Sequence, residues 1–172
     1  MPFSKSATRN RNDLTNDADR VVVVAAGSAL EEYKRCSAYI CLPNRTFQQC
    51  VRMAFYTKNK VYRKVPKIIG RPIEAISAQE IETRTDLSDV EREKLRTLLK
   101  EVDSLRREEW SKEKYKIFFL SPHDSPDTLT LPHDIENDQT SGNGQRTAFT
   151  QGQRYVSLSR LEKGPKSTSE LV

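Results

Sequence analysis

The sequence predicts an α+β fold in which a small sheet and about three helices form one compact domain. Three observations favour it: four β-branched residues at Val21–Val24, several helix-start signals, and an apolar, strand-like run at Tyr115–Leu120. A mostly α fold is the alternative, because short apolar runs fit helix or strand. The 172 residues suit one domain, but the hydrophobic share of 35% is lean for a chain packed throughout.

The compact domain is predicted to span residues 20–120, between two polar segments. Residues 1–19 are rich in Asn and Asp and are predicted to form a flexible arm. Residues 121–172 are dominated by Pro, Ser, Thr, Asp, Asn and Gly, and their large apolar residues follow no period. This composition predicts a disordered tail.

A strand and a helix are predicted to open the domain. The Val21–Val24 run is typical of a buried strand. Ser28 and Glu31 then stand three residues apart, the spacing of a capping box, in which each side chain bonds the other residue's backbone N–H. A helix is therefore expected from residue 29 to about residue 41.

A second helix and a strand are predicted in the middle of the domain. Thr46 and Gln49 have capping-box spacing before an apolar pattern, which predicts a helix over about residues 46–57. The stretch from residue 60 to residue 69 roughly alternates and is rich in β-branched residues, so a strand is expected there. Pro66 would place that strand at an edge or a bulge.

A third helix and a closing strand are predicted to complete the domain. Ser88 and Glu91 form another capping-box pair, and the apolar residues after them keep helical spacing, so one charged helix is expected over residues 89–112. Its apolar stripe covers fewer than three heptads, which favours packing on the sheet over a coiled coil and leaves a homo-oligomer as an open alternative. The closing strand is the Tyr115–Leu120 run.

Charge is distributed very unevenly along the chain. Residues 33–73 carry ten basic side chains and no acidic one, whereas the rest of the chain nets −5 within a total of +5. Attraction to a polyanion needs Lys and Arg gathered without carboxylates to cancel them. The sequence therefore predicts a polyanion-binding protein, with RNA or DNA as the first candidate ligand. A solvated surface that only keeps the protein soluble is the alternative.

The predicted binding residues lie mainly on the expected 60–69 strand and beside it. The six central cations are Lys58, Lys60, Arg63, Lys64, Lys67 and Arg71. Arg45 and Arg52 are predicted to support them, because Arg adds bidentate contacts to phosphate. Tyr62 is predicted to stack on an unpaired base.

An anionic membrane surface is the second candidate partner. A basic segment beside an amphipathic helix suits such a surface, and the expected 46–57 helix carries Phe47, Met53 and Phe55. The same residues fit a protein core, which favours nucleic acid over membrane.

A protein-interaction role is the third candidate. The chain ends in Glu170, Leu171 and Val172. An acidic residue two places before a terminal valine matches the peptides that add a strand to a PDZ groove. Under this hypothesis the tail recruits a protein partner.

Catalysis finds little support, so a non-enzymatic protein without a cofactor is predicted. His123 and His133 fall in the predicted tail, away from a scaffold that could position them. The spacing of Cys36, Cys41 and Cys50 matches no zinc pattern, so no metal site is predicted.

The predicted location is the cytoplasm or the nucleus. Three cysteines cannot all pair, which fits a reducing compartment. The polar start of the chain lacks the apolar core of a secretory signal. The longest apolar run, Val21–Ala26, is far shorter than the roughly 20 residues that span a bilayer, so no transmembrane segment is expected.

Overall fold

A computed structural model describes residues 16–102 and 104–172, which belong to two compact units. The first unit comprises the described residues up to Ala25 together with Gln49–Arg63 and Leu131–Val172. The second unit comprises Ala26–Gln48 and Lys64–Thr130. Each unit is therefore assembled from segments that are far apart in the sequence.

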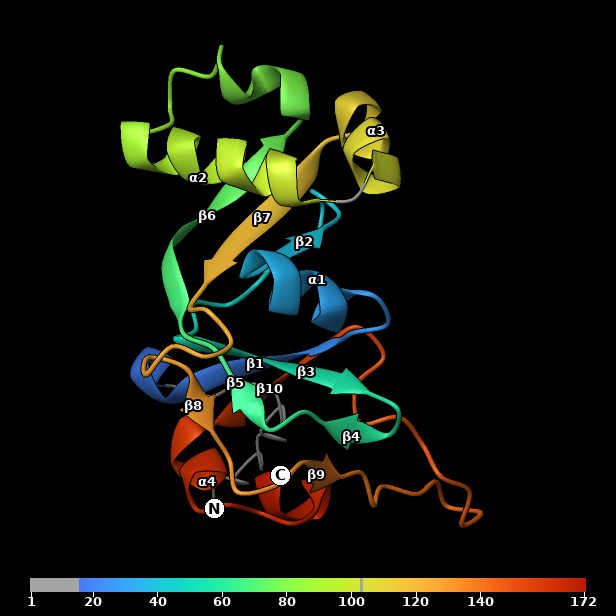
Figure 1. The fold of residues 1–172 in the computed structure, drawn as a ribbon. Helices are drawn as coiled ribbons and strands as arrows, with labels where there is room; N and C mark the ends of the chain where they lie inside the picture. The colour runs from blue at the N-terminus through green and yellow to red at the C-terminus, as the bar shows by residue number, and fades with distance from the viewer. Residues whose placement is uncertain (1–15, 103) are drawn as a thin grey trace, which may run out of the picture. The chain divides into compact units, whose positions relative to one another are not determined.

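The first unit is built on a five-stranded mixed sheet (Figure 1). In spatial order its strands are β10 (Gln153–Ser157), β1 (Arg20–Ala25), β3 (Arg52–Thr57), β4 (Lys60–Val61) and β9 (Ile135–Glu136). β1 pairs antiparallel with β10 and parallel with β3. Val21–Val24 are fully buried, as expected for an internal strand covered on both faces.

Short helical segments complete the first unit. They are η1 (Asp17–Asp19), α4 (Leu158–Glu162) and η3 (Thr168–Leu171), of which η1 and η3 are 3-10 turns. The carboxylate of Asp19 accepts hydrogen bonds from the Ser157 hydroxyl and from the Ser159 backbone N–H. These bonds join the start of the described chain to the end of β10.

The second unit contains two small antiparallel sheets and three α-helices. The larger sheet has the order β2 (Ala38–Cys41), β7 (Tyr115–Leu120), β6 (Ile68–Ile76), and the smaller one pairs β5 (Lys64–Val65) with β8 (Leu129–Thr130). The helical segments are α1 (Ala29–Cys36), η2 (Ala78–Ile81), α2 (Asp89–Glu101) and α3 (Ser104–Lys112).

The core of the second unit lies between its larger sheet and α2 and α3. Trp110 of α3 is 1% exposed, and its indole N–H donates a 2.8 Å hydrogen bond to the carbonyl oxygen of Ile76. Leu95 and Leu98 of α2 and Ile117 of β7 are buried in the same cluster. The indole thus contributes apolar area and also satisfies a strand-end carbonyl group.

The fold prediction is wrong in its elements and in its tail. The described residues form a mixed α and β structure with four α-helices, one five-stranded sheet and two smaller sheets. Residues 121–172, predicted to be disordered, contribute β8, β9, β10 and α4. Their scattered apolar residues, among them Ile135, Phe149 and Leu161, are buried. Short strands and irregular loops need no hydrophobic period, so the pattern of this segment gave no sign of packing.

The predicted 46–57 helix is also wrong. Residues 52–57 are strand β3, which pairs with β1, and residues 45–50 have no regular structure. Met53 and Phe55 are fully buried in the sheet. The amphipathic helix on which the membrane-binding hypothesis depended is therefore replaced by a buried strand.

Two predicted helices end earlier than expected. The first stops at Cys36 because Ser37 adopts a left-handed conformation, with φ of 52°, and donates its N–H to the Tyr33 carbonyl oxygen. The next four residues form β2. The expected 89–112 helix is divided into α2 and α3, since Val102 has an extended conformation.

The predicted flexible arm lies, for residues 1–15, outside the described residues. Within the described part of the chain, every helix is too short or too polar to cross a membrane.

Candidate nucleic-acid interface

The structure divides the predicted binding residues between the two units. Those in the first unit are Arg52, Lys58, Lys60, Tyr62 and Arg63, and those in the second are Arg45, Lys64, Lys67 and Arg71. The expected 60–69 strand is not one element, because this stretch contains β4, β5 and the start of β6. The prediction that the six central cations lie on one strand and its turn is therefore wrong.

Carboxylates from distant segments pair with two of these cations. The ammonium of Lys60 lies 3.0 Å from the carboxylate of Glu136, because β4 pairs with β9. That hydrogen bond raises the pKa of Lys60. Arg71 lies 3.0 Å from the carboxylate of Glu91 in the second unit. Although residues 33–73 contain no acidic residue, carboxylates from other parts of the chain thus neutralise some of their charge.

The three other arginines predicted to bind make contacts within the protein. Arg63 donates its Nε–H to the carbonyl oxygen of Leu131, and Arg45 lies 5.1 Å from the centre of the Phe47 ring. Arg52 is half-buried at the start of β3, roughly 17 Å along that strand from its turn. Tyr62 is half-buried just after β4.

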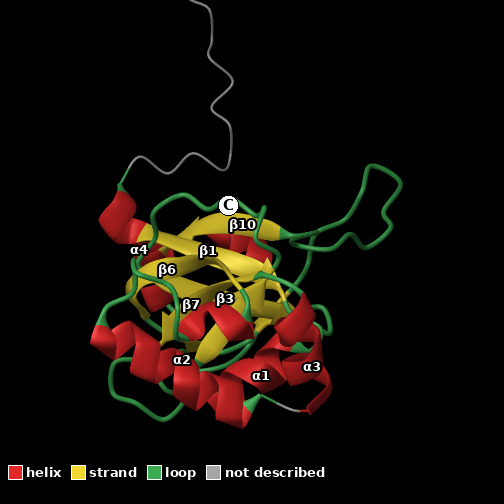
Figure 2. Cartoon of the chain, turned by 90° about the horizontal axis from the view of Figure 1, so that it is seen from above, coloured by secondary structure: helices red, strands yellow, loops and turns green. Residues whose placement is uncertain are grey.

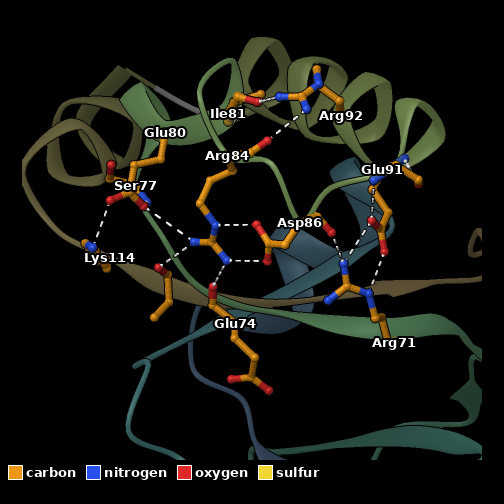
Figure 3. A network of polar contacts seen from close by, with 12 residues as sticks. Arg71, Glu74, Ser77, Glu80, Ile81, Arg84, Asp86, Glu91, Arg92 and Lys114 are labelled. Atoms are coloured by element: carbon orange, nitrogen blue, oxygen red, sulfur yellow. Dashed lines mark hydrogen bonds and ion pairs between the residues drawn. The ribbon is translucent and has the colours of Figure 1, made fainter.

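Arg71 belongs to a network of arginine contacts in the second unit (Figure 3). Arg84 forms a bidentate pair with Asp86, at 2.7 and 2.9 Å, and also donates to backbone carbonyl oxygens of β6. Arg92 donates to the backbone carbonyl oxygen of Arg84. Arg71 extends the network through Glu91 and the carbonyl oxygen of Asp86. These contacts hold the loop between β6 and α2, so Arg71 has a structural role.

Lys58 occupies an unusual position at the tip of the β3–β4 turn. Thr57 pairs with Lys60, so Lys58 and Asn59 form a two-residue turn, with φ of 49° and 63°. A turn with two positive φ angles favours Gly and Asn, and a lysine there is strained by about 1 kcal/mol. Lys58 is exposed, and among the described residues none forms an ion pair with it.

The buried side chain of Asn137 attaches this turn to the segment after β9. The two N–H groups of its Nδ2 are shared among the Tyr56 hydroxyl at 3.2 Å, Asn59 Oδ1 at 3.0 Å and the Thr147 carbonyl oxygen at 2.6 Å. Its Oδ1 accepts from the hydroxyl of Thr168 at 3.0 Å. Asn137 is only 2% exposed, so its hydrogen bonds fix the positions of three separate segments.

A second hairpin extends from this attachment point. Thr140 bridges to Arg146, and the Ser141 N–H donates to the Gln145 carbonyl oxygen at 2.7 Å. Gly144, with φ of 76°, supplies the left-handed residue that such a tight loop needs. Residues 142–148 are all exposed. Figures 1 and 2 both show this loop, hereafter the 140–146 hairpin, projecting away from the sheet.

Arg154 braces the base of the 140–146 hairpin. Its guanidinium lies 4.5 Å from the centre of the Phe149 ring and donates to the side-chain oxygen of Gln139 and to the carbonyl oxygen of Phe149. The Thr147 N–H also donates to the Gln139 carbonyl oxygen at 3.0 Å. The projecting hairpin therefore rests on a hydrogen-bonded base.

The 140–146 hairpin belongs to a second acid-free segment that the sequence analysis missed. Residues 139–161 contain three arginines and no Asp or Glu, but the segment 121–172 as a whole has five basic and seven acidic residues. Counting charges over shorter stretches of sequence would have found residues 139–161. We call Lys58, Lys60 and the exposed residues of the 140–146 hairpin the hairpin surface; its cations are Lys58, Lys60 and Arg146.

Asp138 is the acidic residue at the base of this surface. Its carboxylate accepts hydrogen bonds from the Ser169 hydroxyl at 2.6 Å, from the Ser169 N–H and from the Thr168 hydroxyl. These bonds, that of the Ser169 hydroxyl foremost, lower the pKa of Asp138 to about 2. The carboxylate of Asp138 therefore attaches η3 to the base of the hairpin.

Asp138→Asn is expected to weaken the acid dependence of stability. Because the folded pKa of Asp138 lies below its unfolded value, its stabilising contribution is complete above about pH 4 and disappears as the pH falls towards 2. Urea unfolding at pH 5, 4, 3 and 2.5 should show a shallower decline for the variant than for the wild type. Equal slopes would contradict this assignment.

The C-terminal residues form the 3-10 turn η3, whereas strand addition requires an extended peptide. Glu170 accepts from the N–H groups of Ser167 and Lys166, and Leu171 is 3% exposed within η3. Binding in a PDZ groove would require this turn to unwind. The predicted partner motif of Glu170, Leu171 and Val172 therefore has no preformed strand.

The second unit has an apolar groove of about 750 Å³ beside α2. Ile69, Val90 and Phe119 line it, and the Lys94 ammonium lies 5.4 Å from the centre of the Phe119 ring. Basic and acidic side chains both stand on its rim, so the charge of the rim selects no ligand class.

Comparison with known proteins and a search for clustered metal ligands gave no indication of an activity. The chain matches no protein-family model and no curated protein. Over residues 16–102 and 104–172, no three His, Cys, Asp or Glu side chains lie together as a metal site would require.

Proposed function

We propose that this protein binds nucleic acid, RNA or DNA, through the hairpin surface of its first unit and acts without catalysis. The observation that carries the proposal is the meeting of two acid-free segments at Asn137. One segment brings Lys58 and Lys60, and the other brings Arg146. Cations presented on neighbouring exposed loops can contact successive phosphates of one backbone.

The strained position of Lys58 supports the proposal. A turn selected only for stability would carry Gly or Asn at this site, whereas a lysine presents its ammonium to solvent at the tip. Strain at an exposed, charged position is typical of a residue retained for binding. We place the protein in the cytoplasm or the nucleus, where its free thiols stay reduced.

Lys58→Gly combined with Arg146→Gln is expected to weaken nucleic-acid binding without weakening the fold. Glycine relieves the left-handed strain, so the unfolding free energy should stay equal or rise by up to about 1 kcal/mol. Removing two phosphate contacts should reduce the slope of log K against log salt concentration by about 1 to 2. Fluorescence anisotropy on a labelled 20-base-pair duplex at several salt concentrations measures this slope.

A matched control separates the hairpin surface from net charge. Lys112→Gln with Lys163→Gln removes the same two charges from exposed positions outside that surface. We expect this control to bind like the wild type within a factor of about two. If both double variants lose affinity equally, only the overall charge matters and the hairpin surface is not the site.

Parallel assays distinguish the alternative partners. RNA, duplex DNA and anionic liposomes should be offered to the wild type under identical salt conditions. The proposal expects nucleic acid to be bound and liposomes to be left in solution. Sedimentation with liposomes that RNA cannot compete away would instead support membrane binding, and failure to bind all three would support an adaptor role.

A further inference from the structure

We infer that the ligand of the hairpin surface is double-stranded DNA and that the 140–146 hairpin enters its major groove. This inference rests on the proposed function and specifies its ligand. It depends on the shape of the hairpin, on the side chains at its tip and on the way its base is held.

The hairpin has the dimensions of a groove-binding ribbon. Its arms are joined by the Thr140–Arg146 bridge and by backbone hydrogen bonds from Thr147 to Gln139 and from Ser141 to Gln145, and a turn near Asn143 closes it. With three to four residues on each side, the rise of an extended strand sets an upper limit of about 10 to 13 Å on its projection. The major groove of B-DNA is roughly 8.5 Å deep and admits a two-stranded β-ribbon. A hairpin of this length can therefore reach base edges.

The tip carries side chains suited to base edges. Asn143, Gln145 and Arg146 are exposed in succession, separated only by Gly144. Asn and Gln form bidentate hydrogen bonds with adenine, and Arg forms them with guanine. Gly142 and Gly144 have open space around them, so the ribbon is narrow at the point of entry. A loop that served only as a connection would not need three such side chains on its turn and one arm.

The base of the hairpin is held in place before a ligand binds. Asn137 fixes it to the β3–β4 turn, and Arg154 packs on Phe149 beneath it. Asn137 and Phe149 are buried and Arg154 is half-buried. A base held by these bonds reduces the ordering entropy that a free loop would lose on binding.

The same shape argues against duplex RNA. The major groove of A-form RNA is deep and narrow, so side chains cannot read its bases. Single strands are bound mainly by stacking on aromatic side chains, and the 140–146 hairpin contains none. We therefore expect duplex RNA and single-stranded DNA to contact only the cations of the hairpin surface.

A charge-neutral variant tests this inference. Asn143→Ala with Gln145→Ala removes two base-reading side chains and leaves every charge in place. Asn44→Ala with Gln79→Ala, at exposed positions in the second unit, is the matched control. The probes are a randomised pool of 20-base-pair DNA duplexes, and a mixed-sequence 20-mer as duplex DNA, duplex RNA and single-stranded DNA.

The wild type should bind duplex DNA at least about tenfold more tightly than the other two forms at 100 mM salt. It should also select preferred sequences from the pool. The hairpin variant should lose about tenfold or more in affinity for a selected sequence, with an unchanged salt slope, while the control keeps both. Equal binding of duplex RNA, or an unaffected hairpin variant, overturns the inference and leaves the proposed function standing. A wild type that binds none of the probes overturns both.

Discussion

Trp110→Ala is expected to lower the unfolding free energy of the second unit by about 3–5 kcal/mol. The side chain is 1% exposed, so its removal leaves a cavity between α3 and the sheet. It also leaves the Ile76 carbonyl oxygen without its 2.8 Å indole donor. Urea unfolding followed by circular dichroism measures the loss, because Trp110 is the only tryptophan and the variant has no indole fluorescence.

Trp110→Phe separates the two contributions. Phenylalanine fills most of the cavity but donates no hydrogen bond, so a loss of about 1–3 kcal/mol is expected. Lys112→Ala, at an exposed position of the same helix, should change stability by less than about 0.5 kcal/mol. If Trp110→Ala unfolded at the same urea concentration as the wild type, the described packing of α3 would be incorrect.

Asn137→Ala is expected to cost the first unit about 2–4 kcal/mol. The change removes donors to Tyr56, Asn59 and Thr147 and the acceptor of the fully buried Thr168 hydroxyl. Each of these hydrogen bonds contributes about 0.5–1.5 kcal/mol, and the loss is moderated because Asp138 still accepts from the Thr168 hydroxyl and Tyr56 still bonds Asn59. Urea unfolding by circular dichroism gives the loss, and indole fluorescence of Trp110 reports the second unit separately.

The same variant also tests how the hairpin surface is assembled. With the turn and the hairpin base no longer joined, nucleic-acid affinity should fall at least about tenfold under conditions in which the variant is still folded. Asn143→Ala changes an exposed asparagine of the hairpin tip and should leave stability within about 0.5 kcal/mol of the wild type. Undiminished stability of Asn137→Ala would mean that its hydrogen bonds do not hold the segments together.

Local signals in the sequence identified the strongest elements of the fold. The valine run is the internal strand β1, and the Tyr115–Leu120 run is β7 with the predicted bounds. The capping box of Ser88 and Glu91 is present, with hydrogen bonds of 2.8 and 3.1 Å in the two directions. These elements could be predicted because the interactions that define them lie within a few residues.

Elements that depend on distant pairing could not be predicted. The Thr46 and Gln49 pair has capping-box spacing, yet residues 52–57 pair with β1 instead, because the sheet buries Met53 and Phe55 completely. β9 and β10 lie in the segment predicted to be disordered, and each is specified by its partner strand. Local propensity is overridden in both cases by tertiary contacts.

Two of the three cations of the hairpin surface could be predicted from the sequence. The charge asymmetry pointed to Lys58 and Lys60, but it did not show that Glu136 would pair with Lys60 or that Glu91 would pair with Arg71. Arg146 was missed because the net charge of residues 121–172 is negative, although residues 139–161 within them carry no acidic side chain. The hydrogen bonds of Asn137, together with the contact between the Tyr56 and Phe149 rings, bring the two acid-free segments together.

The salt dependence of wild-type binding to a 20-base-pair DNA duplex tests the central claim most directly. Lys58 and Arg146, with Lys60 already paired to Glu136, should give a slope of log K against log salt concentration of about −2, so affinity falls steeply between 50 and 200 mM salt. Absence of binding at 50 mM salt, or binding that does not change with salt, would contradict the proposal that this surface binds nucleic acid.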